Sequence, residues 1–162
     1  MHILAYFPPL LGVLALVYAA LQAAWITKQN PGEAKMQAIA QSIAQGAVAF
    51  LKAEYKVISY FVVVVALLLA YLGITSAHAH PLIAVAFVVG AIFSGLAGWV
   101  GMNIATQANV RTAQAARNSL ASAFGISFAG GTVMGMGVTG LAMVGLGSLF
   151  IVFFLYFLLG DS

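Results

Sequence analysis

Four long apolar stretches, separated by short polar ones, predict that this chain crosses a membrane four times. The stretches are residues 3–26, 57–74, 82–108 and 131–159. A helix needs roughly 20 apolar residues to cross about 30 Å of hydrocarbon. The valine run at residues 62–65 favours a strand in water, but a lone strand in lipid would leave its backbone amides unpaired. We therefore predict an all-α fold: a polytopic membrane protein with four transmembrane helices.

The first polar region, residues 27–56, is predicted as a cytoplasmic loop that contains the start of a helix. Asn30 is expected to cap this helix, with Pro31 at its first position and Glu33 three residues after the cap. The apolar residues that follow are compatible with an amphipathic helix. We expect that helix to run on into the second span.

The second polar region, residues 109–130, is predicted as another cytoplasmic loop, with a weakly polar helix at 119–128. It carries Arg111 and Arg117, whereas the four lysines all lie in the first region. The loop at residues 75–81 and the two ends of the chain carry no Lys or Arg. Cytoplasmic loops of membrane proteins are enriched in these residues. The count predicts both termini on the non-cytoplasmic side.

Composition agrees with a membrane protein and excludes several other classes. Hydrophobic residues make up 64% of the chain and charged residues only 6%, and the mean hydropathy is +1.08. A soluble domain carries about a quarter charged residues. The net charge of +3 comes from short loops beside apolar runs, so we expect no nucleic-acid partner. The absence of cysteine excludes disulfides and thiolate chemistry.

Acidic and basic residues are missing from the places where transport and phosphate chemistry need them. The four predicted spans contain no Asp, Glu, Lys or Arg, although ion pumps normally place such groups within the bilayer. The chain has three carboxylates, and Asp161 is predicted on the opposite side of the membrane from Glu33 and Glu54. Magnesium-assisted phosphoryl chemistry needs several carboxylates together. We expect no catalytic, cofactor-binding or metal-binding residue in this chain.

Two motifs have an ordinary structural interpretation. Gly135, Gly137 and Gly140 match the Gly-x-Gly-x-x-Gly spacing of dinucleotide sites, but that fingerprint requires a preceding strand. Inside a membrane span the glycines are predicted to serve helix packing. His78 and His80 alternate in a loop without a third ligand nearby, and they are interpreted as exposed loop residues and not as a metal site.

The third span carries small residues at intervals of four, which is typical of helices that pack closely in membranes. The two sets are Gly90, Ser94 and Gly98, and Ala97, Gly101 and Ala105.

The charged residues near the spans are predicted to be structural. Lys52, Glu54 and Lys56 are placed at the cytoplasmic membrane edge, where lysines extend to the interface and Glu54 is solvated or paired with another segment. Arg111 and Arg117 could meet phosphates, but membrane topology alone accounts for them.

Three blocks of this sequence resemble the amino-terminal region of the membrane-bound, ion-translocating inorganic pyrophosphatases. Residues 46–56 read Gly-Ala-Val-Ala-Phe-Leu-Lys-Ala-Glu-Tyr-Lys, and residues 130–135 read Gly-Gly-Thr-Val-Met-Gly. Residues 101–117 contain Gly-Met-Asn-Ile-Ala-Thr, then Asn-Val-Arg-Thr-Ala and a final Ala-Ala-Arg. The blocks follow the family's order and spacing. One departure is Ala129, where the family often has a basic residue.

The resemblance implies a larger protein than the chain itself. Family members are homodimers with many more membrane helices, and they couple hydrolysis of magnesium pyrophosphate to pumping of protons or sodium, in some cases with potassium. The resemblance covers only the first four helices, which belong to an outer ring. We therefore expect an amino-terminal portion of such a pump, inactive alone, in a prokaryotic plasma membrane. Glu54, Lys56, Arg111 and Arg117 match family blocks without matching a catalytic role.

Two other functions remain to be weighed against this one. The chain could be a stand-alone four-helix membrane scaffold or modulator of a partner, without catalytic activity. It could also be a ring subunit of a rotary enzyme, but such a subunit needs a carboxylate in the middle of a span, and none is present.

Overall fold

The computed structural model describes residues 6–76 and 80–160, and within them the chain forms four α-helices and no strand. The helices are α1 (Phe7–Thr27), α2 (Ala34–Thr75), α3 (Leu82–Ala116) and α4 (Leu120–Gly160). All four are long and apolar enough to cross a membrane. The predicted all-α fold with four helices of this kind is confirmed.

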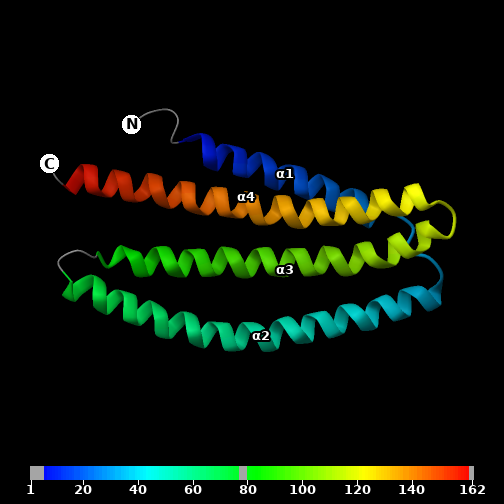
Figure 1. Ribbon diagram of the computed structural model, residues 1–162, viewed down its shortest axis with the longest axis horizontal. Coiled ribbons are helices and arrows are strands. Elements are labelled where there is room, and N and C mark those ends of the chain that lie inside the picture. The colour runs from blue at the N-terminus through cyan, green and yellow to red at the C-terminus, as the bar shows by residue number, and fades with distance from the viewer. Residues whose placement is uncertain (1–5, 77–79, 161–162) are drawn as a thin grey trace.

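The helices lie side by side in an open row, in the order α1, α4, α3, α2 (Figure 1). Within the described residues α4 packs against α1 and α3, whereas α2 packs only against α3. Successive helices are antiparallel, so α1 begins and α4 ends at the same end of the row. Because the row is open, most large apolar side chains lie on its outside, where lipid or further protein must cover them.

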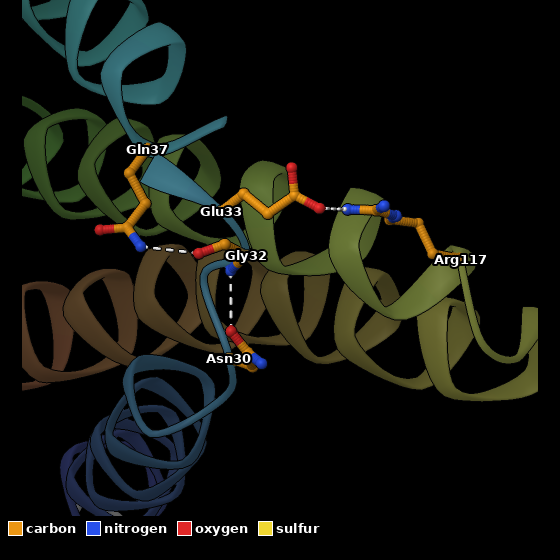
Figure 2. Close-up of polar contacts among 5 residues, drawn as sticks. All are labelled: Asn30, Gly32, Glu33, Gln37 and Arg117. Carbon is orange, nitrogen blue, oxygen red and sulfur yellow. Dashed lines mark hydrogen bonds and ion pairs between the residues drawn. The ribbon is translucent and has the colours of Figure 1, made fainter. Parts of the chain in front are cut away.

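The start of α2 differs from the prediction. The helix begins at Ala34 with Glu33 in the cap position, and Asn30 does not cap it. The reason is Gly32, whose φ of +86° is a left-handed conformation that interrupts a helix starting at Pro31. The Asn30 side chain instead accepts a hydrogen bond from the Gly32 amide at 2.8 Å, which closes a tight turn between α1 and α2 (Figure 2).

The lengths of the helices also differ from the lengths of the predicted spans. Residues 109–130, predicted as a loop with a helix at 119–128, are helical except for the turn at 117–119, so the predicted helix is present as the start of α4. This segment is rich in Ala, the best helix former, so α3 continues past its apolar part and α4 begins before its own. The first polar region does continue as one helix into the second apolar stretch, as predicted. The membrane boundaries along these helices stay a prediction.

Glycines let α4 approach both of its neighbours closely. A Cβ atom added to Gly140 would stand 2.8 Å from the Leu16 side chain and 2.9 Å from the Gly12 carbonyl oxygen, both on α1. A Cβ atom on Gly145 would stand 2.9 Å from the Phe93 ring of α3. Lipid gives helices no hydrophobic drive to associate, so close van der Waals contact at small residues takes that role.

Two of the small residues on α3, Gly98 and Gly101, lie against two different helices. A Cβ atom on Gly101 would stand 3.0 Å from Met134 of α4, and one on Gly98 would stand 3.0 Å from the Tyr55 hydroxyl of α2. Gly90 has open space where a Cβ atom would be. The predicted close packing therefore holds at Gly98 and Gly101 and not at Gly90.

Substitution of two glycines on α4 tests this packing. We expect Gly140→Ala to lower the free energy of unfolding by about 1–3 kcal/mol, because the new methyl group overpacks the contact with α1. The matched control is Gly135→Ala, since an added Cβ there meets nothing within 4 Å. That variant should be neutral or slightly stabilising. Unfolding monitored by circular dichroism in detergent micelles measures both, and equal losses would contradict the close crossing.

Candidate functional site at the basic end of the row

Arg111 on α3 holds the end of α1 in place. Its Nε donates to the Gln29 carbonyl at 3.2 Å and its Nη2 donates to the Thr27 carbonyl at 3.1 Å. A third hydrogen bond, from Nη1, goes to the Gln107 carbonyl of its own helix at 2.9 Å. The last carbonyls of a helix lack partners within the helix and carry partial negative charge. The half-buried guanidinium therefore completes the C-terminus of α1.

Sequence reasoning explained Arg111 by membrane topology and did not foresee this contact. The signal was indirect: the last turn of α1 contains no basic residue of its own, so its carbonyls needed a donor from elsewhere in the chain. Arg111 follows α1 by more than 80 residues in the sequence. Only the fold brings the two together.

Arg117 forms an ion pair with Glu33, the residue in the cap position of α2. Its Nη1 lies 2.5 Å from the Glu33 Oε1, and the two side chains are 53% and 66% exposed. Gln37 adds a hydrogen bond from its Nε2 to the Gly32 carbonyl at 2.7 Å. Figure 2 shows these contacts around the turn before α2. An exposed pair of this kind contributes little to stability, but it links the end of α3 to the start of α2.

Tyr55 sets the register between α2 and α3. Its hydroxyl donates a hydrogen bond to the Gly95 carbonyl at 2.6 Å, in a partly buried position. Gly98 leaves room for the hydroxyl on the next turn of α3. Tyr55 lies within the block at 46–56 that resembles the family, and its role here is to fix one helix against another.

The charged residues beside Tyr55 are exposed. They are Lys52, Glu54 and Lys56, and none of them forms an ion pair with another described residue. The alternative that Glu54 pairs with another segment finds no partner within residues 6–76 and 80–160. These three side chains are available to water, to lipid headgroups or to protein outside the row.

Of the two histidines in the loop, only His80 lies within the described residues. His78 and Asp161 lie outside the described residues. His80 accepts a hydrogen bond at its Nδ1 from the Leu82 amide at 3.2 Å, and its ring meets that of Tyr156 edge-on at 5.8 Å between centroids. In the part of the chain that the structure describes, no three His, Asp or Glu residues lie together.

The glycine motif lies in the interior of α4, and no strand precedes it in the described residues. It therefore lacks the strand and helix start of a dinucleotide site. Gly140 packs against α1, as predicted for helix packing. Gly135 and Gly137 have open space where a side chain would be.

A cavity between α3 and α4 has a volume of ≈ 520 Å³ and is mostly apolar. Ser94 is its one hydroxyl-bearing lining residue. With no charged group in its wall, this cavity offers nothing that could hold an anion or a metal ion.

Comparison with known proteins identifies the family of this chain. The chain matches the inorganic H⁺ pyrophosphatases over residues 13–157. It belongs to that family. The resemblance inferred from the three sequence blocks is thereby confirmed.

Similar proteins within the family are named as ion pumps. One, named as a candidate K⁺-stimulated pyrophosphate-energized sodium pump of Clostridium tetani, is 48% identical over 78% of this chain. A K⁺-insensitive pyrophosphate-energized proton pump of Moorella thermoacetica is 43% identical over 88%. Another, of Methanosarcina mazei, is 39% identical over 94%. The alignments cover 18%, 20% and 22% of these proteins, so the chain spans about a fifth of their length.

The two arginines of α3 give a matched test of the site. We expect Arg111→Gln to lower the free energy of unfolding by about 2 kcal/mol, because it leaves partly buried carbonyls of α1 without a charged donor. Arg117→Gln removes an exposed pair and should cost at most about 1 kcal/mol. Both variants remove one positive charge from the same helix end. Chemical unfolding in micelles compares them, and a larger loss for Arg117→Gln would contradict the assigned roles.

Proposed function

We propose that this chain supplies four helices to a pyrophosphate-energized ion pump, in which hydrolysis of pyrophosphate drives transport of protons or sodium. The observation that carries the proposal is membership of the family over nearly the whole chain. The names of the relatives supply the two ions. The four membrane-length helices fit the same function. Hydrolysis itself is assigned to parts of the pump outside this chain.

The side chains of the row support the assignment of hydrolysis to other parts of the pump. Pyrophosphate hydrolysis in this family is expected to use Mg²⁺, and potassium in some members. Mg²⁺ prefers several oxygen ligands close together. The described carboxylates do not fit this need, because Glu33 pairs with Arg117 and Glu54 lies several turns further along α2. We therefore route no catalytic step through this chain, and we propose that it holds no catalytic or metal-binding residue.

We also propose an orientation and a setting for the row. All six Lys and Arg residues lie away from the end where α1 begins and α4 ends, which supports termini on the non-cytoplasmic side. The chain is an integral membrane protein, and its bacterial and archaeal relatives favour a prokaryotic plasma membrane. The partners proposed are lipid, further helices of the same pump and, for the complete pump, a second copy.

A split pump tests the function. The Clostridium tetani relative is produced without the part that aligns with this chain, and this chain is supplied separately in the same membranes. We expect magnesium-dependent pyrophosphate hydrolysis at background level from either piece alone and well above background from the two together. Phosphate release in isolated membranes measures it.

The relative's own missing part, supplied in the same way, is the control for assembly. Recovery of activity with that part but not with this chain would count against the proposal. Hydrolysis by this chain alone would overturn the assignment of catalysis to other parts, and would favour an independent enzyme.

A further inference from the structure

An apolar groove runs between α2, at the edge of the open row, and α3 beside it (Figure 1). The groove has a volume of ≈ 490 Å³ and is lined by valine, alanine and leucine residues alone. Three of these residues, Val63, Leu67 and Val85, are at least 50% exposed. Such a lining fits hydrocarbon, because its side chains offer no hydrogen bond to a polar ligand.

Two lysines lie on the same face of α2 as this groove. Lys52 and Lys56 precede the groove residue Val63 by eleven and seven residues, which are about three and two turns of an α-helix. Helical residues separated by whole turns lie one above the other on one face. One strip of α2 therefore leads from two ammonium groups to the apolar groove.

Trp99 places α3 on the same strip. It follows the groove residue Val88 by eleven residues, again about three turns. Its side chain also lines a small groove together with Val48 and Leu51 of α2. Because Val48 is one turn before Lys52, the lysine and the indole lie on the same side of the two helices.

The positive charge of this strip is not balanced by other side chains. Neither Lys52 nor Lys56 forms an ion pair within the described residues. Glu54 is two positions from each lysine, which is about 200° around the helix, so its carboxylate lies on the other side of α2. The sequence contains no Asp, Glu, Lys or Arg from residue 57 to residue 110. The strip is therefore positive at one end and uncharged along the rest.

The positive end of the strip has the side chains of a membrane interface. Lysines extend towards water, and helical side chains lean towards the N-terminus of their helix, which for α2 is the basic end of the row. Both features bring the ammonium groups towards Trp99 and Asn103, which line the small groove there. Tryptophan is enriched where hydrocarbon meets lipid headgroups.

We propose that one anionic phospholipid binds along this strip. Its phosphate lies at Lys52 and Lys56, its glycerol region lies against Trp99, and one acyl chain lies in the apolar groove between α2 and α3. The strip thus matches a lipid in both of its parts, a charged head and an apolar tail.

Charge complementarity decides the class of lipid. Lysines near a membrane surface attract anionic lipids, whereas a zwitterionic headgroup would bring a further positive charge beside the two ammonium groups. A helix is a poorer occupant, because two unpaired ammonium groups beside the groove would lose water on contact with it. The proposal concerns one bound molecule, and so goes beyond the bulk lipid around a membrane protein.

Fluorescence of Trp99 tests the proposal, because the chain has two tryptophans and Trp25→Phe leaves one. This variant is placed in vesicles of phosphatidylcholine with brominated acyl chains, which quench an indole that they touch. Unbrominated phosphatidylglycerol then replaces a rising share of the lipid, and unbrominated phosphatidylcholine does so in a reference series. We expect the recovery of fluorescence to show a several-fold preference for phosphatidylglycerol. Equal recovery in the two series would overturn the proposal.

Two double variants that remove the same charge separate a bound lipid from attraction to the chain as a whole. We expect Lys52→Gln with Lys56→Gln to remove the preference. Lys28→Gln with Lys35→Gln, at the basic end of the row, should keep it. An equal loss in both double variants would show a diffuse attraction and would overturn the bound lipid.

Two neighbouring valines test the groove. Val63 lines it and Val64 does not, although the two are 56% and 65% exposed. Val63→Phe fills part of the groove, so we expect it to lower the preference towards that of the Lys52 and Lys56 double variant, whereas Val64→Phe should leave it unchanged. Equal effects of the two substitutions would overturn the position of the acyl chain. Circular dichroism in the same vesicles checks that each variant keeps its helices.

A second copy of the chain is the other occupant that this experiment can reveal. Quenching of Trp99 by brominated lipid that weakens as the protein-to-lipid ratio rises would assign the strip to such a copy and would overturn the proposal. All of these measurements use this chain alone, so their outcome is separate from that of the split-pump assay.

Discussion

Close backbone contact at glycines is the constraint on which this structure depends. α4 lies between α1 and α3, and Gly140 and Gly145 leave no side chain where it approaches each of them closely. In lipid, apolar side chains gain nothing by leaving their surroundings, so contact at short range must supply the attraction between helices. The open row follows from this, since α2 has such a contact with α3 alone.

Polar contacts then fix how the helices are placed along one another. Arg111 ties α3 to the end of α1, Tyr55 ties α2 to α3, and Arg117 ties α3 to the turn before α2. Because all three involve α3, this helix carries the register of the whole row. Arg111 and Arg117, which the sequence explained by membrane topology alone, thus also align the helices.

The same contacts suit the proposed role of this chain as a support within a pump. A row with fixed register and an exposed apolar surface is suited to support other helices, and a site for pyrophosphate needs rigid surroundings to place its charged groups. Support of this kind requires packing surfaces and helix ends. It does not require ionisable groups within the bilayer, and the four apolar stretches of the sequence contain no Asp, Glu, Lys or Arg.

Sequence alone determined the number of helices, their apolar parts and the family, because those depend on local hydrophobicity and on residue blocks that can be read in order. It placed the start of α2 wrongly, since Pro31 and Asn30 are good start signals and only the backbone shows Gly32 in a left-handed conformation. It could not show that Arg111 meets α1 or that Tyr55 lies level with the middle of α3. Those facts join residues far apart in the chain, so only tertiary packing, which sets one helix against another, decided them.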